Sequence, residues 1–234
     1  MAYLSVDDGY LNILNWFGTD TPYRHERLVE AMRDIIDNAG EFPGWVSSSL
    51  HSGQDVPGTA NLIQMRSREA IEKRYKREKM VTETMPAFYQ WTTWFKSVKT
   101  EVVFTQTHPD LGGIVEISPE REDFTVLTLF AADPENQAAL IETLAQPDEW
   151  LKTVPGFRSH SILRGIDGTH VAMYAQWESK DAYDAFHVLP ESERPEEVRQ
   201  RRAIGQSLVN SHEPHTYTIA HSRSAADART GDRA

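Results

Sequence analysis

The chain has 234 residues, a formal net charge of −11, 39% hydrophobic and 10% aromatic residues, and no cysteine. This composition is sufficient for a globular core, and it excludes disulfides, thiolate nucleophiles and thiolate metal ligands. The negative charge argues against nucleic acid or an anionic membrane as partner and favours a small, largely neutral ligand. The N-terminus lacks the features of a secretory signal and no apolar run is long enough to span a bilayer, so we expect a cytoplasmic protein.

The first half reads as strand, helix, two strands, helix and strand. Aromatic and branched residues at 10–18 predict the opening strand, and a Thr-Pro pair then starts a helix with Leu28, Met32 and Ile36 at helical spacing. A Pro-Gly pair ends this helix and begins a hairpin that turns at a Gly-Gln-Asp segment. Ser67 caps the next helix, and a strand rich in Val, Phe and Thr ends the half.

The second half repeats this order. EFPGWVSSSLHSGQDVPGTANLIQMRSREA (41–70) aligns with TVPGFRSHSILRGIDGTHVAMYAQWESKDA (153–182) without a gap, and with one slip FTQTH (104–108) falls over YTIAH (217–221). Such self-similarity indicates two copies of one structural unit. The identical pairs are Pro43/Pro155, Gly44/Gly156, Ser47/Ser159, Ser49/Ser161, Gly53/Gly165, Asp55/Asp167, Gln64/Gln176, Ser67/Ser179 and Ala70/Ala182.

The order β-α-β-β-α-β is the ferredoxin-like arrangement of an antiparallel sheet with helices on one face. The other face of the sheet needs a partner, and two units in one chain can pack sheet against sheet. We therefore predict an α+β fold of tandem ferredoxin-like repeats, a dimeric α+β barrel formed as an intramolecular pseudo-dimer. The expected boundaries are an N-terminal domain at 1–108, a linker at 109–122, a C-terminal domain at 123–222 and a disordered tail at 223–234.

Strand alternation gives Met173 and Trp177 the same face, and Asn61 and Met65 hold the equivalent positions in the first half. If that face looks towards the helices, each half encloses a cavity between sheet and helices. Tyr183, on the following helix, would reach into the second of these cavities.

The stretch VAMYAQWESKDAY (171–183) strongly resembles the antibiotic biosynthesis monooxygenases, particularly the quinone-forming anthrone oxygenases. In that family an Asn and a Trp of one strand and a Tyr of the next helix line the substrate cavity. Trp177 and Tyr183 match the Trp and the Tyr, Met173 stands at the Asn position, and Asn61 supplies the Asn in the first half. The tandem form also resembles the flavin-assisted oxygenases that open or contract ring B of angucyclines, the jadomycin, gilvocarcin and kinamycin type.

The resemblance implies an oxygenase that acts with O2 on a polycyclic aromatic polyketide in antibiotic biosynthesis, by quinone formation or by opening ring B of an angucyclinone. The substrate anion itself donates an electron to O2, so the protein must exclude water from the bound substrate. Donors such as Asn61, Trp177 and Tyr183 would stabilise the negative charge on the substrate oxygen, and His160 is the candidate general base. No tightly bound cofactor is expected. Reduced FMN or FAD as a diffusible co-substrate, a flavin reductase partner and a homodimer stay open.

Further candidates for substrate binding are Met173, Met65, Tyr75, His187 and His51. Related barrels often carry a histidine at the position of His187, and Tyr75 is its counterpart in the first half. A strand histidine is more often only a satisfied polar residue, and a strand tryptophan more often only core. The histidines show no metal-ligand spacing, and a GxGxxG dinucleotide fingerprint is absent from the sequence.

Two other readings remain open at this point. A haem enzyme of the chlorite dismutase and coprohaem decarboxylase type also places two ferredoxin-like halves in one chain, and His187 would be its proximal ligand. The purified protein would then show a Soret band. A non-catalytic polyketide-binding protein would consume no oxygen with any polycyclic phenol.

Overall fold

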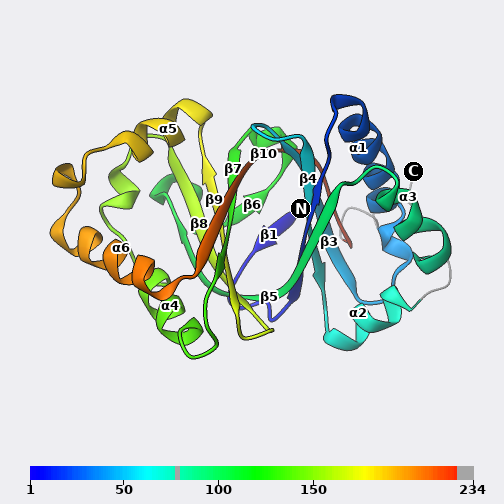
Figure 1. The fold of residues 1–234 in the computed structure, drawn as a ribbon, viewed down its shortest axis with the longest axis horizontal. Helices are drawn as coiled ribbons and strands as arrows, with labels where there is room; N and C mark the ends of the chain where they lie inside the picture. The colour runs from blue at the N-terminus through cyan, green and yellow to red at the C-terminus, as the bar shows by residue number, and fades with distance from the viewer. Residues whose placement is uncertain (77–79, 226–234) are drawn as a thin grey trace.

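The computed structural model describes residues 1–76 and 80–225, and a closed eight-stranded barrel forms its framework (Figure 1). The strands follow one another around the barrel in the order β10-β3-β4-β2-β5-β8-β9-β7, and each neighbouring pair is antiparallel. Their bounds are β2 Leu11–Gly18, β3 Trp45–Gly53, β4 Gly58–Met65, β5 Trp94–Thr107, β7 Phe124–Ala131, β8 Phe157–Gly165, β9 His170–Trp177 and β10 Ser211–Ser224.

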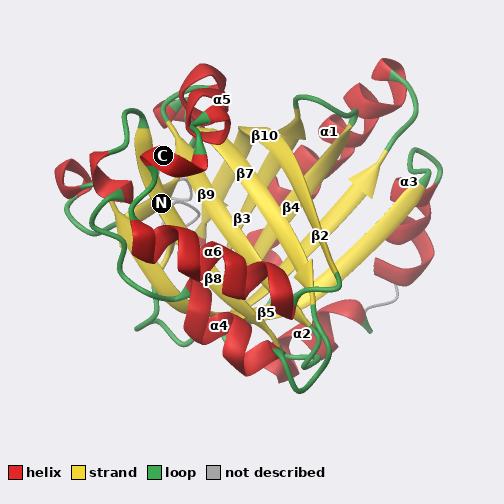
Figure 2. Cartoon of the chain, turned by 60° about the vertical axis from the view of Figure 1, so that its left-hand side comes forward, coloured by secondary structure: helices red, strands yellow, loops and turns green. Residues whose placement is uncertain are grey.

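Helices cover the outside of the barrel in two layers, one on each half (Figures 1 and 2). The N-terminal layer consists of α1 Pro22–Asp37, α2 Arg68–Tyr75 and α3 Met85–Tyr89, and the C-terminal layer of α4 Gln137–Leu144, α5 Lys180–Val188 and α6 Glu196–Leu208. Short helical turns lie at Ala39–Glu41, Met80–Thr84, Pro109–Leu111, Pro119–Arg121, Leu151–Thr153 and Glu191–Glu193. The predicted α+β architecture of tandem ferredoxin-like units is confirmed. Among the described residues, no helix is both long and apolar enough to cross a membrane.

The Pro-Gly pairs of the repeat mark the closest approach of helix to strand in each half. Gly44 and Gly156 have φ angles of +81° and +76°, which glycine adopts without strain. A methyl group on Gly44 would lie 2.6 Å from Cβ of Ala70, and one on Gly156 would lie 2.4 Å from Cβ of Ala182. Both conformation and space therefore require glycine, which explains why the two pairs coincide in the sequence.

The two longest strands, β5 and β10, join the halves into one barrel. Each has 14 residues. β5 pairs with β2 of its own half and with β8 of the other, and β10 pairs with β7 and with β3. A bulge interrupts β5 between Val102 and Phe104 and β10 between Ile219 and His221. The alignment of 104–108 with 217–221 is therefore wrong, because the pairing makes Phe104 equivalent to His221.

A small two-stranded sheet of β1 (Ala2–Leu4) and β6 (Val115–Ile117) packs inside the barrel (Figure 1). Tyr3 and Glu116 face each other across it. Two equivalent glutamines hold it to the wall. Gln64 donates to the carbonyl of Tyr3 at 3.1 Å, and Gln176 donates to the carbonyl of Glu116 at 2.8 Å. The segment 109–122, predicted as a linker, thus contains a core strand.

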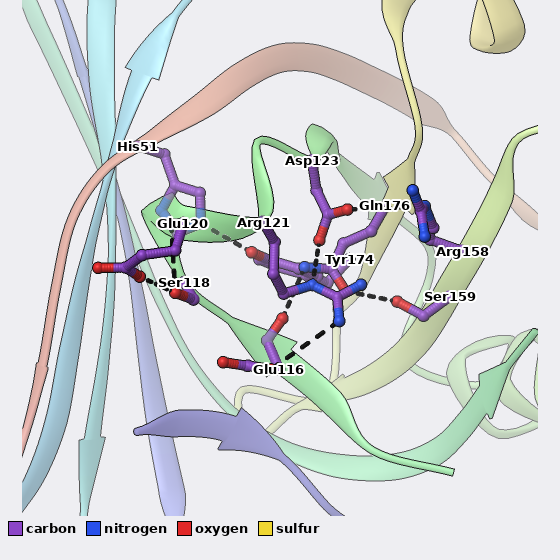
Figure 3. A network of polar contacts seen from close by, with 10 residues as sticks. All are labelled: His51, Glu116, Ser118, Glu120, Arg121, Asp123, Arg158, Ser159, Tyr174 and Gln176. Carbon is purple, nitrogen blue, oxygen red and sulfur yellow. Dashed lines mark hydrogen bonds and ion pairs between the residues drawn. The ribbon is translucent and has the colours of Figure 1, made fainter. Parts of the chain in front are cut away.

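Each glutamine also accepts a hydrogen bond from a buried serine at 2.6 Å, Ser47 for Gln64 and Ser159 for Gln176. Figure 3 shows the second of these pairs. We predict that Gln64→Leu and Gln176→Leu each lower the free energy of unfolding by about 1–3 kcal/mol, because buried partners lose their hydrogen bonds. Denaturant unfolding measures this loss. The exposed Gln146→Leu is the control, and an equal effect there would contradict the prediction.

A histidine and a tyrosine form a fully buried pair in the barrel interior (Figure 3). Nδ1 of His51 lies 3.3 Å from the carbonyl of Ala60, and Nε2 lies 2.9 Å from the hydroxyl of Tyr174. The Tyr174 hydroxyl therefore donates to a neutral imidazole that donates in turn to the backbone. Burial lowers the pKa of His51 to about 4 and raises the pKa of Tyr174.

The pKa of His51 predicts how stability depends on pH. The unfolded chain binds this proton below about pH 6.5 and the folded chain only below about pH 4, so stability falls as the pH drops through this window. We expect a loss of about 2 kcal/mol from this group between pH 7 and pH 5. His51→Leu should flatten the dependence of the unfolding free energy on pH, whereas exposed His212→Gln should not. If the unfolding free energy depended equally on pH in the parent protein and in both variants, the prediction would be contradicted.

The C-terminal end of β10 lies two residues past the expected domain boundary, at Ser224, whose hydroxyl accepts a hydrogen bond from the amino group of Met1 at 2.7 Å. Residues 226–234 of the predicted tail lie outside the described residues. The division into domains at 1–108 and 123–222 stays a prediction, since the two units share their sheet.

Candidate active site

A cavity of about 260 Å³ lies between the sheet and the helices of the N-terminal half. Strands β2 to β5 supply its floor, and α1, α2 and the segment 84–88 supply its walls. Aromatic and branched side chains provide its apolar surface, namely Phe17, Ile35, Ile36, Ile63, Met85, Phe88 and Phe95. Its polar surface consists of Asn15, Ser48, Asn61, Arg74, Tyr75, Thr84 and Ser97. An apolar chamber with a few buried polar groups is the usual form of a small-molecule site.

A row of polar side chains crosses the floor of the cavity. Asn15 on β2 stands opposite Asn61 on β4 and opposite Ser97 on β5, so all three project to the same face. Both asparagines are buried. The amide nitrogen of Asn61 lies 3.4 Å from the sulfur of Met32, and its amide oxygen has no hydrogen-bond partner among the described residues. A buried amide oxygen without a partner can accept a hydrogen bond from a ligand hydroxyl.

Helix α2 adds a cation and a phenol to the cavity. Its first turn is fixed by Ser67, whose hydroxyl accepts a hydrogen bond from the backbone N–H of Ala70 at 3.2 Å. Arg74 is 4% exposed, and its guanidinium carbon lies 4.3 Å from the ring centroid of Phe42. Burial raises the pKa of Tyr75, which also hydrogen-bonds the side chain of Asn15. The phenol is therefore neutral at physiological pH.

The equivalent space in the C-terminal half is filled by aromatic rings. Trp177 is 3% exposed, and its ring centroid lies 5.0 Å from that of Phe186, 5.7 Å from Phe157 and 5.9 Å from Tyr183. By the repeat, Phe186 corresponds to Arg74. Helix α6, with 13 residues, packs beside α4 (Figure 2), whereas among the described residues of the N-terminal half the helical turn Met80–Thr84 runs directly into the five-residue α3. More covering helix and larger rings close this side.

The structure brings together some of the predicted site residues and separates others. Trp177 and Tyr183 meet on the helix-facing side, as the strand alternation predicts. Asn61 and Tyr75 line the cavity of the other half. Asn61 and Trp177 therefore lie on opposite sides of the barrel. His187 is exposed, and its ring packs on Tyr183 with the centroids 4.1 Å apart.

The histidines of β3 and β8 lie on different faces of the barrel wall. These strands are not neighbours, since β4, β2 and β5 lie between them. His51 points into the barrel interior with no exposed surface and lines neither cavity that we describe, and its role in substrate binding stays a prediction. His160 faces the helices of the C-terminal half, with its ring centroid 5.5 Å from Phe104, and burial lowers its pKa to about 4. It contacts neither cavity that we describe, and its role as a base stays a prediction.

The two methionines predicted to bind substrate lie away from the cavity floor. Met65 has no exposed surface and packs in a core cluster with Trp45 and Ile71. Met173 is half-buried and packs against the cluster that contains Leu140. A second cavity, of about 50 Å³, lies beside Trp94 and is too small for a polycyclic ligand. Within the described ranges, no three His, Asp or Glu side chains gather as a metal site.

Two cavity residues have no signal in the sequence. Arg74 is one of several charged residues on a polar helix, and its repeat partner is a phenylalanine. Asn15 lies on a strand where apolar residues predominate, and only the pairing with Asn61 reveals its orientation. Asn15 could be found only once the register of β2 was known, and Arg74 only once the place of α2 over the sheet was known.

Known proteins place this architecture in a family. The family model described as antibiotic biosynthesis monooxygenase matches residues 123–194. A crystal structure described as an anthrone oxidase-like protein is 38% identical, with a TM-score of 0.89, and the match covers 96% of this chain and 97% of that chain. The chain belongs to the antibiotic biosynthesis monooxygenase family.

One further relative agrees with this assignment, and a more distant structure shares the fold. The tetracenomycin-F1 monooxygenase of Streptomyces glaucescens is 36% identical over 75 residues, which are 32% of this chain and 67% of that enzyme. A ferredoxin-fold protein of Listeria monocytogenes related to this family is 10% identical with a TM-score of 0.50 over 91% of this chain and 96% of that one, which shows the fold alone. The protein is thus an oxygenase, and both the haem reading and the non-catalytic reading are set aside. Nothing in these comparisons supports a flavin co-substrate.

The aromatic cluster around Trp177 yields a prediction about stability. Trp177→Ala should lower the free energy of unfolding by about 3–5 kcal/mol, because it leaves a large hole among Phe157, Tyr183 and Phe186. Trp177→Phe, which keeps a ring, should cost clearly less. Chemical denaturation measures both values. A Trp177→Ala protein as stable as the parent would contradict the description of this residue as core.

Proposed function

We propose that this enzyme oxidises a hydroxylated polycyclic aromatic polyketide with O2 and that the reaction takes place in the N-terminal cavity. The observation that carries the location is the row of Asn15, Asn61 and Ser97 on the floor of an otherwise apolar chamber. The likeness to the anthrone oxidase-like protein along nearly the whole chain supports the type of substrate. The tetracenomycin-F1 monooxygenase supports a role in polyketide tailoring.

The reaction needs little covalent chemistry from the protein. An anthrone methylene loses two hydrogens and gains one oxygen atom from O2, and the second oxygen atom leaves as water. The deprotonated substrate supplies the first electron to O2, so the chamber must hold the aromatic rings away from water. The apolar walls, including Phe17, Ile63 and Phe88, provide this environment. The proposal includes no cofactor.

The polar groups of the floor and of α2 orient the substrate. The amide oxygen of Asn61 accepts a hydrogen bond from a substrate hydroxyl, and the neutral phenol of Tyr75, held by Asn15, donates towards the oxygen on which charge develops. Among the described residues that line the cavity, no carboxylate or imidazole is present. In this proposal the substrate ionises by its own acidity, and the rate should follow its ionisation as the pH rises.

The pseudo-symmetry of the chain provides matched variants that locate the reaction. Asn61→Ala and Asn15→Ala should lower kcat/KM by about tenfold to hundredfold, because each removes a buried group that orients the substrate. Met173→Ala, at the repeat equivalent of Asn61, and Trp177→Phe should leave it within about threefold. Oxygen uptake with an anthrone, without flavin, measures the rates.

Near-UV circular dichroism controls for folding in all four variants. Loss of activity in Trp177→Phe together with full activity in Asn61→Ala would move the reaction to the C-terminal half. Product mass separates the two possible outcomes of the chemistry on an angucyclinone. A gain of one oxygen with loss of two hydrogens indicates quinone formation, whereas the mass and fragmentation of a ring-opened product indicate cleavage of ring B.

A further inference from the structure

A buried serine on β3 presents an unused hydrogen-bond donor to the N-terminal cavity. Ser48 lines this cavity and is 1% exposed. Its Oγ accepts a hydrogen bond from the indole N–H of Trp45 at 2.9 Å. An indole nitrogen can only donate, so this bond occupies a lone pair of the serine oxygen and leaves the hydroxyl proton over. Among the described residues, no acceptor meets that proton.

A β-bulge puts Trp45 and Ser48 on the same face of the sheet. Residues three apart on a regular strand face opposite ways, but the register of β3 against β4 shifts between Trp45 and Ser47. Ser48 consequently stands opposite Ile63, which also lines the cavity. Trp45 stands opposite Met65 and packs with it in a core cluster. The core thus holds the indole, and the indole fixes the serine oxygen at the cavity wall.

The donor of Ser48 complements an acceptor in the same cavity. Asn61 lies two places before Ile63 on β4, so Ser48 and Asn61 are diagonal neighbours on one face of an antiparallel pair. Residues in this relation lie about 7–8 Å apart. The amide oxygen of Asn61 has no hydrogen-bond partner among the described residues. The cavity therefore offers a donor and an acceptor at two separate points, at a distance that a fused ring system can span.

The surroundings strengthen the donor and make its pairing important. A hydroxyl whose oxygen accepts an N–H bond is polarised and donates more strongly. In a chamber with mostly apolar walls, a donor left unpaired costs free energy, so a ligand that meets it gains affinity. The C-terminal half lacks this arrangement. Its equivalent residues are Phe157, which has no N–H, and His160, whose ring centroid lies 5.9 Å from that of Phe157.

We propose that Ser48 donates its hydrogen bond to a keto oxygen of the aromatic ligand, while Asn61 accepts one from a ligand hydroxyl. A keto oxygen accepts and has no proton of its own, so it matches a site where only the donor is available. The cavity then selects hydroxylated polycyclic ketones over analogues without the keto group. The proposal rests on the assignment of the N-terminal cavity as the substrate site. Ser48 determines specificity, and Trp45 is its positioning residue.

The affinities of two ligands in the absence of O2 test this inference. 2-Hydroxyanthraquinone has keto oxygens and 2-hydroxyanthracene has none, and titration calorimetry on the full-length protein gives both dissociation constants. Their ratio in a variant, compared with that in the parent, cancels the difference in hydrophobicity between the ligands. Ser48→Ala should reduce the preference for the quinone by about threefold to thirtyfold. The affinity for 2-hydroxyanthracene should stay within about twofold, because that ligand does not use the donor.

Three further variants separate the hydrogen bond from packing. Ser48→Thr keeps the hydroxyl and should keep the preference. Trp45→Phe keeps a ring but frees the hydroxyl to rotate, and it should reduce the preference by about twofold to fivefold. Ser49→Ala is the matched control, because Ser49 is equally buried on β3 but faces the interior, where it shares a hydrogen bond with Ser222 at 2.9 Å. An unchanged preference in Ser48→Ala, or an equal loss in Ser49→Ala, would overturn the inference.

The two proposals fail in different ways. If Ser48→Ala keeps the preference for the quinone while Asn61→Ala loses turnover, the role of Ser48 is wrong and the proposed function stands. If Ser48→Ala loses the preference while Asn61→Ala keeps full turnover, the cavity binds aromatic ketones but the oxidation takes place elsewhere.

Discussion

Closure of the barrel is the constraint on which the rest of the structure depends. β5 and β10 each pair with both halves, so the sheet has no free edge and its inner face is sealed. The interior is filled by side chains and by the β1–β6 sheet. The larger of the two described cavities accordingly lies on the outer face, beneath a helical layer. This explains why the candidate site lies between sheet and helices and not between the two repeats.

Duplication allows the two outer faces to differ. The C-terminal face is packed by Trp177 and its neighbouring rings and covered by α6, so it contributes stability. The N-terminal face leaves a chamber of about 260 Å³ and buries polar groups in it, which costs stability. A single unit would have to satisfy both demands with one set of side chains. The tandem chain assigns stability to one half and the cavity to the other, since both halves together close a single barrel.

The sequence predicts the framework well because local rules specify it. The paired glycines, the serine caps and the strand alternation recur in both halves and have the structural roles that they indicate. The faces of His51 and His160 could not be predicted in the same way. A bulge between Trp45 and Ser47, repeated between Phe157 and Ser159, reverses the alternation along β3 and β8. His51 therefore points inwards, and His160 points towards the helices. Nothing in the local sequence marks either bulge.

The family match lies in the C-terminal half and the cavity in the N-terminal half, and side-chain packing explains how the two findings are compatible. The match at 123–194 spans β7 to β9, α4 and α5, and includes Trp177 and Tyr183. Here Trp177 contacts both Tyr183 and Phe186 and is buried among rings, and a site role for Trp177 and Tyr183 stays a prediction. The amide that the proposed site uses is present at Asn61, in the other half. Once two units close one barrel, only one outer face has to keep a cavity. The floor of that cavity has a polar residue, Asn61, where the C-terminal half has Met173.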